Sequence, residues 1–353
     1  VKLHAFQSLE GRDLEGVVLR HPFFERDSRV VLADFVSQEE GSGCVHIAPG
    51  HGLEDFSLTQ KYDLPVLMPV DEKGIFQEPD EFRGVSVAQA TKKVIELLRE
   101  KGLLVAHNEI RHSYPSCWRC KTPIIFRATY QWFLNVDHEN LRERILKEAE
   151  TVQWFPPQGK ERMKGMVLLR PDWCLSRQRL WGVPIPAVKC THCKSVVLDA
   201  DIIAKVAEIF RRKGSDAWFT HAVEEFLPEG FVCRQCTQRT FQKEHDILDV
   251  WFESGASFIA VVKKNPQLRF PADMYLEGSD QHRGWFQVSL IPSVASQQCA
   301  PFESILTHGF VVDGEGKKMS KSLGNVIAPQ EVIEKYGAEI LRVWVAYSDY
   351  SED

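Results

Sequence analysis

The chain has 353 residues and a formal net charge of −6, with 44% hydrophobic and 26% charged residues. This composition is ordinary for a globular protein and excludes a disordered or fibrous chain. No apolar run approaches the ~18 residues of a membrane-spanning helix, so we expect no role in a membrane. The length allows roughly two to three domains. The acidic balance excludes a nucleic-acid binder that works mainly by bulk positive charge.

Strand-like and helix-like segments alternate along the chain, most clearly in its second half. Apolar residues at a spacing of three and four indicate helices, and short apolar runs indicate strands. In chain order we expect a strand over 29–36, helices over 86–101 and 138–150, a buried strand over 166–169, a helix over 200–212, a strand over 274–276, a helix over 284–297, a strand over 305–312 and a helix over 330–347. The alternation predicts an α/β fold with a parallel sheet and functional residues at the carboxyl ends of its strands.

Six of the nine cysteines fall in three C-x-x-C pairs, Cys117/Cys120, Cys190/Cys193 and Cys233/Cys236. The last two pairs frame one insertion, and four thiolates in this pattern are the ligand set of a structural Zn²⁺ site. Reduced, unligated cysteines are the alternative, and His192 is a weaker substitute ligand. Cys117 and Cys120 are only half a site by themselves.

Residues 317–325 combine three lysines, two of them three residues apart, with Gly and Ser in one loop. The ammonium groups of Lys318 and Lys321 suit phosphates as point charges. Ser320, Ser322 and backbone N–H groups add hydrogen bonds to phosphate oxygens. A generic lysine-rich loop would be a solvated turn, but the string KMSKSLGN resembles the ATP loop of class I aminoacyl-tRNA synthetases.

Three further blocks resemble the corresponding parts of isoleucyl-tRNA synthetases in order and spacing. They are RPDWCLSRQR with WGVPIP at 170–186, DVWFESG at 249–255 and YLEGSDQHRGWF at 275–286. The resemblance extends over nearly the whole chain. It implies the second half of a Rossmann-type nucleotide-binding domain with a zinc-knuckle insertion, and the later part of an inserted, β-rich α/β editing domain.

The resemblance also implies a domain layout. The editing domain is expected at 1–137, the return to the Rossmann-type catalytic domain at 138–189 and the zinc-knuckle insertion at 190–236. The rest of the catalytic domain, with the KMSKS loop, is expected at 237–329, and the start of a helical region that contacts tRNA at 330–353.

The expected amino-acid pocket is assembled from residues near 251 and 280. A small aliphatic amino acid needs apolar walls and acceptors for its ammonium group. Trp251 and Trp285 can supply flat walls, and Asp280 and Gln281 can supply acceptors. The resemblance implies that Gln281 lies near the amino group, Glu277 against the aminoacyl-adenylate and Lys321 against ATP.

The implied reaction is attack of the isoleucine carboxylate on the α-phosphate of ATP, followed by transfer of the aminoacyl group to tRNA(Ile). Mg²⁺ is expected with the ATP. Because charge builds on the phosphates, positioned cations and alignment supply the catalysis, and no nucleophilic side chain is needed. We expect a monomer of bacterial type, in the mitochondrial matrix or, as the alternative, in a bacterial cytoplasm.

A second site is expected in the segment GCVHIAPGHGLEDF at 43–56. The resemblance to editing domains places His46 and Asp55 at functional positions, where His46 contacts a ribose hydroxyl or water and Asp55 holds an amino-acid ammonium. Ile47 stands where Thr is common. Isoleucine and valine differ by one methylene, which is worth about 1–3 kcal/mol of binding free energy in an apolar pocket; this pair is the standard example of how little one pocket can discriminate. A second site must therefore remove valine from tRNA.

The chain contains no HIGH-type motif and no threonine-rich editing segment. We therefore expect an internal part of a longer enzyme that cannot activate isoleucine alone. Three alternatives stay open: valine specificity, an editing or tRNA-binding module without ligase activity, and a zinc-stabilised interaction module.

Overall fold

The computed structural model describes residues 9–37, 42–117, 120–321 and 324–350. The chain forms two compact units, Val1–Tyr130 and Gln131–Asp353, and each is taken by itself below. Among the described residues, no helix combines the length and the apolar character that a bilayer crossing requires.

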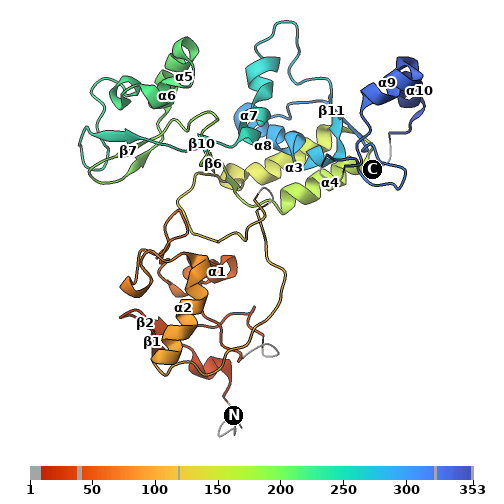
Figure 1. Cartoon of the computed structure of the whole chain (residues 1–353). Coiled ribbons are helices and arrows are strands. Elements are labelled where there is room, and N and C mark those ends of the chain that lie inside the picture. Colours follow the sequence, from red (N-terminus) through yellow and green to blue (C-terminus); the bar gives the residue numbers. More distant parts are fainter. Residues whose placement is uncertain (1–8, 38–41, 118–119, 322–323, 351–353) are drawn as a thin grey trace. The chain divides into compact units, whose positions relative to one another are not determined.

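The first unit holds a small hairpin and two main helices (Figure 1). The elements are η1 (Gly11–Leu14), β1 (Val18–Arg20), β2 (Asp27–Arg29), α1 (Leu53–Tyr62), η2 (Asp80–Phe82) and α2 (Val87–Glu100). The predicted helix over 86–101 is confirmed as α2, which begins with a capping box between Ser86 and Gln89. Within the described residues, regular strand in this unit is limited to the β1–β2 pair, less than a β-rich domain requires.

The predicted strand over 29–36 is wrong beyond Val30. β2 pairs antiparallel with β1, and the last ladder-like bonds join Val30 to Val17 and Gly16. The N–H of Leu32 instead donates to the hydroxyl of Tyr62 at 3.2 Å. A β-branched run is strand-like only where another strand can pair with it, and β1 begins only at Val18, opposite Arg29, so no described strand faces the residues after Val30.

A three-stranded parallel sheet lies at the centre of the second unit. Its order is β11 (Tyr275–Gly278), β12 (Ser304–His308), β4 (Gln153–Phe155), with Gly278 opposite His308 and Leu306 opposite Phe155. Helix α8 (Trp285–Gln297) connects β11 to β12 as a βαβ crossover. The predicted parallel sheet, the strand near 274–276 and the helix over 284–297 are confirmed.

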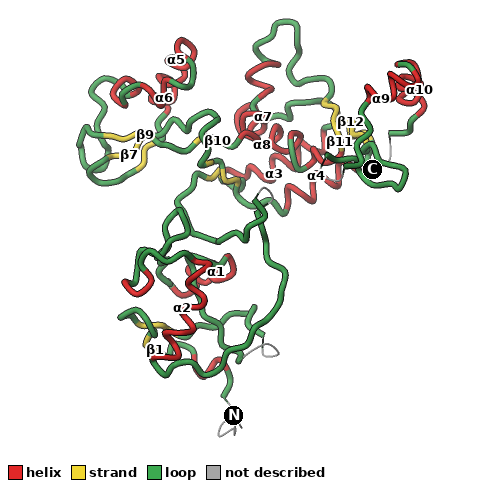
Figure 2. Tube along the Cα trace, in the orientation of Figure 1, coloured by secondary structure: helices red, strands yellow, loops and turns green. Residues whose placement is uncertain are grey.

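Helices enclose this sheet and share one core with it. α3 (Leu141–Thr151) packs on α4 (Gln158–Leu168) and on α8, and α7 (Val250–Gly255) packs on α8 (Figure 2). The predicted helix over 138–150 is confirmed as α3, preceded by the short turn η3 (His138–Asn140). Helix α8 is buried on nearly all sides, because residues 286–291 are all buried, the polar Gln287 and Ser289 among them.

The predicted buried strand over 166–169 is wrong, since these residues end α4. Met163 and Val167 are both buried and lie four residues apart, so they form the inner face of a helix. Periodicity alone cannot decide whether a short apolar run forms a strand or a helix. The buried strand of this region is β4, which precedes the helix and was not predicted.

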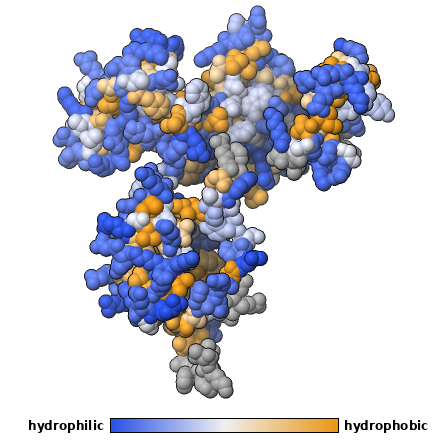
Figure 3. Space-filling view, viewed as in Figure 1, coloured by the Kyte–Doolittle hydropathy of each residue, from blue (hydrophilic) through white to orange (hydrophobic). Residues whose placement is uncertain are grey.

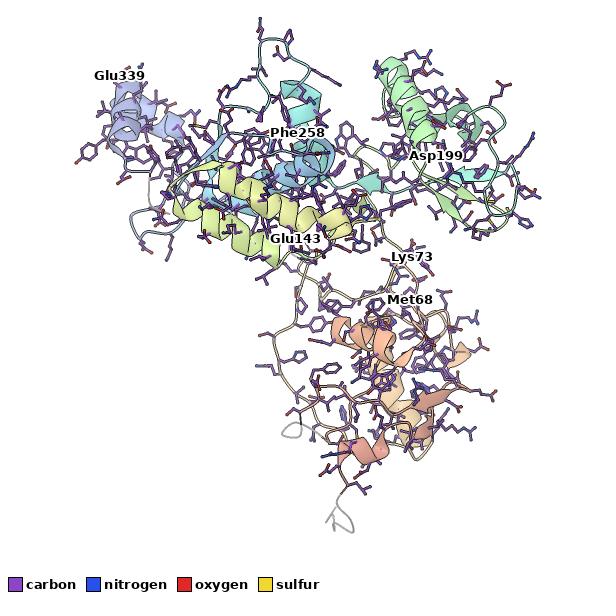
Figure 4. All side chains as sticks on the ribbon, turned by 180° about the vertical axis from the view of Figure 1, so that it is seen from behind. Met68, Lys73, Glu143, Asp199, Phe258 and Glu339 are labelled. Carbon is purple, nitrogen blue, oxygen red and sulfur yellow. The ribbon has the colours of Figure 1, made fainter. Side chains whose placement is uncertain are left out.

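The insertion that holds the second and third cysteine pairs has a core of its own. Its antiparallel sheet has the order β8 (Val196–Val197), β7 (Val188–Cys190), β9 (Phe241–Lys243). Ile202, Val206, Trp218 and Phe226 are buried against this sheet from α5 (Ala200–Lys213), α6 (Ala217–Thr220) and η4 (Val223–Phe226). The predicted helix over 200–212 is confirmed as α5, which Asp199 caps (Figure 4).

Two further strand pairs join the insertion and the incoming chain to the central sheet region. They are β6 (Ser176–Arg177) with β10 (Ile247–Leu248), and β3 (Phe133–Leu134) with β5 (Trp173–Cys174), both antiparallel. The remaining short helical turns are η5 (Phe258–Val262) and η6 (Ser279–His282).

The predicted helix over 330–347 is two helices, α9 (Pro329–Tyr336) and α10 (Ala338–Tyr347). Gly337 separates them with φ of 85°, a conformation that ends a helix and that glycine adopts at little cost. The space-filling view shows apolar side chains at the surface of these helices (Figure 3). They include Ile333, Ile340, Val343, Trp344 and Val345.

Candidate functional site

The four cysteines of the insertion converge on one point. Their sulfur atoms all lie within 4.8 Å of one another. Sγ of Cys190 is 3.6 Å from that of Cys236, and Sγ of Cys193 is 3.5 Å from that of Cys233. Zn–S bonds of about 2.3 Å place the corners of a tetrahedron roughly 3.8 Å apart. The sulfur arrangement therefore fits one Zn²⁺ ion.

The two C-x-x-C turns of this cluster have the same backbone structure. In each, the N–H of the first cysteine bonds the carbonyl five residues later, and the N–H four residues later bonds back to the first cysteine. Lys194 and Thr237, which directly follow the second cysteines, have φ of 63° and 59°. This tight turn points both sulfurs to the same side.

Cys117 and Cys120 of the first unit form a third turn of this kind. The Cys117 N–H bonds the carbonyl of Thr122 at 2.8 Å, the Lys121 N–H bonds the Cys117 carbonyl at 2.8 Å, and Lys121 has φ of 60°. Within the described residues no further cysteine, histidine or carboxylate joins these two sulfurs in a cluster. Cys117 and Cys120 thus have the geometry of half a metal site.

Ser195 adds a hydroxyl to the four-cysteine cluster that sequence analysis did not identify. Its Oγ lies 3.1 Å from Sγ of Cys193 and 3.3 Å from Sγ of Cys233. The Ser195 hydroxyl, followed by backbone N–H groups, lowers the pKa of the Cys233 thiol to about 6. Metals bind the thiolate form, so this hydroxyl favours a ligated cluster.

The predicted pocket residues Glu277, Asp280 and Gln281 follow one another at the carboxyl end of β11 and in η6. Glu277 and Asp280 are exposed, whereas the Gln281 side chain is half-buried. Its Oε1 accepts a hydrogen bond of 2.9 Å from the N–H of Trp285, at the start of α8. The side-chain oxygen of Gln281 therefore caps the helix. The NH₂ group of the same side chain takes no part in this cap.

The two predicted tryptophan walls differ in their surroundings. A Cβ on Gly284 would overlap Oε1 of Gln281, so this position requires a glycine. The same Cβ would lie 3.1 Å from Cη2 of Trp251, which shows that Trp251 and Gln281 lie beside each other at Gly284. Trp251 is 42% exposed and can offer an open face. Trp285 instead stacks on Tyr275, with ring centroids 3.9 Å apart and planes 5° apart. One face of Trp285 is thus covered by the protein's own core.

The lysine loop folds as a narrow hairpin after β12. Val312 and Lys318 form an antiparallel β-bridge, and the Asp313 carboxylate accepts hydrogen bonds from backbone N–H groups of the turn. The Asn325 side chain accepts a bond of 2.9 Å from the N–H of Ser320 and donates one of 2.8 Å to Oδ2 of Asp313. Lys321 is exposed. Ser322, the fourth predicted residue of this loop, lies outside the described residues.

Phe310 connects this loop to β11. The Lys318 ammonium lies over the Phe310 ring, and Cε1 of Phe310 lies 3.4 Å from the position that a Cβ on Gly278 would occupy. The structure therefore brings Lys318 to the strand end that carries Glu277, as a shared site requires.

A cavity of about 250 Å³ opens at the carboxyl ends of the parallel strands. Its polar lining includes Gln158, Arg162, Ser279, His282, Thr307 and His308. Ser279 and His282 lie in the block at 275–286 that the sequence analysis quoted. The other four residues were not singled out there. The rule that sites lie at strand ends would have found Thr307 and His308, but Gln158 and Arg162 follow β4, the strand that was missed.

The predicted editing residues lie close to each other in the first unit. Asp55 is in the first turn of α1, and its Oδ2 accepts a hydrogen bond of 3.0 Å from the N–H of Ala48. Partial burial, and then the charge of Arg26, lower the pKa of His46, while Asp55 opposes this shift. His21, which sequence analysis did not identify, lies edge-on to His46 with ring centroids 6.1 Å apart.

Residues 10–353 match the family described as tRNA synthetases class I (I, L, M and V). The chain belongs to the class I tRNA synthetases. It therefore has the class I tRNA synthetase fold, as the KMSKS resemblance implied.

Two individual relatives with the same name are similar to the chain. The chain is 55% identical over 350 residues to "Isoleucine--tRNA ligase" of Thermotoga maritima, an alignment that covers 98% of this chain and 38% of that protein. It is 55% identical over 341 residues to the protein of the same name from Desulfotalea psychrophila, covering 96% and 36%. The chain thus spans less than two fifths of the length of these relatives.

A solved structure of Mycobacterium tuberculosis methionyl-tRNA synthetase bound by methionyl-adenylate also matches. Its identity is 16% and its TM-score 0.40, with 65% of this chain and 35% of that chain covered.

Proposed function

We propose that the complete protein containing this synthetase chain is an isoleucine–tRNA ligase. The observation that carries the proposal is the 55% identity to a relative of that name across 98% of the chain. The geometry supports it, because the lysine loop and the segment Glu277–Gln281 meet at the carboxyl edge of one parallel sheet. The substrates are isoleucine, ATP and tRNA(Ile), with Mg²⁺ bound to the ATP.

In this proposal the chain's own residues bind and align the reactants. Lys318 and Lys321 bring positive charge to the phosphates, where negative charge develops as the isoleucine carboxylate attacks the α-phosphate. Ser320 and Ser322 add hydrogen bonds to phosphate oxygens. Trp251 and Trp285 border the isoleucine side chain, Asp280 and Gln281 orient its ammonium group, and Glu277 contacts the adenylate. Alignment in one site replaces a covalent intermediate.

The domain layout remains part of the proposal. The first unit would be the later part of the editing domain, which places its end at Tyr130, seven residues before the expected boundary at 137. The insertion at 190–236 would be a zinc knuckle, with a structural Zn²⁺ held by Cys190, Cys193, Cys233 and Cys236. The two isoleucine–tRNA ligases compared above are bacterial, and a bacterial-type monomer fits a bacterial cytoplasm or the mitochondrial matrix.

Isoleucine-dependent exchange of pyrophosphate into ATP tests the ligase proposal. The complete protein should exchange with isoleucine and far less with valine. Exchange that prefers valine would assign the protein to the valine enzymes, and no exchange with any aliphatic amino acid would contradict ligase activity. Lys321→Ala should reduce exchange by tenfold or more if the lysine contributes a charged hydrogen bond of about 1.5–3 kcal/mol.

Editing of valyl-tRNA(Ile) is a second candidate function, favoured because the Asp55 carboxylate lies near enough to His46 to oppose the lowering of its pKa. Hydrolysis of valyl-tRNA(Ile) by the complete protein, without ATP, measures it. Asp55→Ala and His46→Ala should each slow this hydrolysis and leave isoleucine-dependent exchange unchanged. Equal hydrolysis by wild type and both variants would contradict the assignment of these two residues.

A further inference from the structure

Asp249 is a buried carboxylate that accepts three hydrogen bonds from three different segments. It is 4% exposed. Its Oδ2 accepts from Nη2 of Arg177 at 2.7 Å and from Nε1 of Trp173 at 3.1 Å. Its Oδ1 accepts from the N–H of Trp251 at 3.2 Å, which caps α7. A buried carboxylate is stable only when its oxygens are satisfied in this way.

The position of Asp249 in the chain links the insertion to the pocket. Strand β10 leaves the four-cysteine insertion and pairs with β6, and Asp249 is the next residue after β10. The Asp249 N–H also bonds the Leu175 carbonyl at 2.6 Å. One turn further, Oε1 of Glu253 accepts from the N–H of Val183 at 3.0 Å. Helix α7 is thus held by the two chain segments that enter and leave the insertion.

The same helix carries the exposed pocket wall. A Cβ on Gly255, at the end of α7, would overlap the carbonyl oxygen of Val288, so α7 and α8 touch through their backbones there. At the other end of α7, the ring of Trp251 reaches Gly284 beside Gln281. Because α7 contacts α8 closely at Gly255, a shift at Asp249, at the other end of α7, would change the position of Trp251 relative to Gln281.

We infer that Asp249 is a positioning residue for the amino-acid pocket, which holds the Trp251 wall through its bonds to Arg177, Trp173 and the start of α7. The inference rests on the proposed isoleucine activation and concerns specificity within it. Asp249 itself need not touch the substrate. Its carboxylate sets how closely the Trp251 wall fits a branched side chain.

Asp249→Asn in the complete protein tests the inference, since an amide keeps the size but presents NH₂ to donors. A merely structural role would alter the KM for ATP, the KM for isoleucine and kcat together. The positioning role predicts a KM for isoleucine raised roughly 5- to 20-fold, an isoleucine-to-valine ratio of kcat/KM that falls, and an unchanged KM for ATP. Pyrophosphate exchange gives all of these values.

Asp137→Asn is the matched control. Asp137 also forms a two-bond pair with an arginine near a helix start, Arg142, and is not one of the pocket residues named above. Its variant should keep the wild-type ratio. Arg177→Lys is the second variant, which keeps the positive charge but removes the planar guanidinium group. It should lower the isoleucine-to-valine ratio of kcat/KM as Asp249→Asn does, but by a smaller factor.

Each outcome decides the inference. An unchanged isoleucine-to-valine ratio in Asp249→Asn, or equal increases in both KM values, would overturn it. If Asp249→Asn does not fold, an unchanged ratio in Arg177→Lys overturns it instead. A wild-type protein without isoleucine-dependent exchange overturns the proposed function together with this inference, whereas an active wild type with an unaltered variant overturns the inference alone.

Discussion

The ammonium nitrogen of Lys318 lies 3.4 Å from the centroid of the Phe310 ring. Phe310 follows β12 and reaches Gly278 at the end of β11, so the ring lies between the lysine loop and the strand that carries Glu277. An aromatic face attracts a cation without neutralising it with a carboxylate. The lysine is therefore held near the strand ends while its charge stays available to phosphate.

Phe310→Leu should weaken ATP use without removing activity. A cation–π contact at an exposed site is worth about 0.5–1 kcal/mol, so we expect the KM for ATP to rise roughly two- to fivefold in pyrophosphate exchange. Tyr336→Leu removes a similar contact with Lys335 on α9 and serves as the control. An unaltered KM for ATP in Phe310→Leu would show that the ring does not help to hold Lys318.

The four-cysteine cluster should bind one Zn²⁺ and lose it when a ligand is removed. Cys233→Ser should lower the zinc content, measured by atomic emission, by one ion per chain and lower the unfolding temperature of the insertion. Cys299→Ser changes a half-buried cysteine outside the cluster and should leave both values unchanged. Equal zinc contents in the two variants would contradict the assignment.

Gly255→Ala should destabilise the second unit strongly. The new methyl group would overlap the Val288 carbonyl oxygen, so α7 must move away from α8. Overpacking of this kind costs about 1–3 kcal/mol. Gly165→Ala is the control, because a Cβ there meets no atom within 4 Å and alanine favours a helix by about 1 kcal/mol. Denaturant unfolding should therefore shift in opposite directions for the two variants.

His21 should make the stability of the first unit depend on pH. Its Nδ1 accepts N–H bonds from Phe23 and Phe24, both at 3.1 Å. Burial, followed by the charges of Arg26 and His46, lowers the pKa of His21 to about 4, so the folded chain stays neutral there while the unfolded chain takes up a proton below 6.5. Stability contributed by neutral His21 is therefore lost as pH falls from 6.5 towards 4.

His21→Asn should reduce this pH dependence, because an amide oxygen can accept the same N–H bonds without titrating. Thermal unfolding at pH 6.5, 5.5 and 4.5 measures the change in stability. His107→Asn replaces an exposed histidine of the same unit and should keep the wild-type dependence. Parallel curves for wild type and His21→Asn would refute the prediction.

Local patterns in the sequence predicted the elements whose signal is contained in a few neighbouring residues. Helices α2, α3 and α5 were predicted because apolar residues repeat along one face of each. The predictions failed where partners lie far away in sequence. β4 pairs with β12, about 150 residues later, and the short apolar run at 166–169 joined a helix because Met163 supplied the preceding inner position.

By itself, the sequence determined the family and the chemistry that is available. The KMSKS string, the pocket blocks and the C-x-x-C pairs are contiguous, so reading them requires no knowledge of the fold. Only the tertiary structure decided which groups act together: that Trp285 is covered by Tyr275, that Ser195 joins the cysteines, and that Asp249 binds Arg177, Trp173 and the start of α7. The bonds from Ser195 to Cys233 and from Asp249 to Arg177 and Trp173 join residues 38, 72 and 76 positions apart. Packing and hydrogen bonding across such separations leave no periodic pattern in the order of the amino acids.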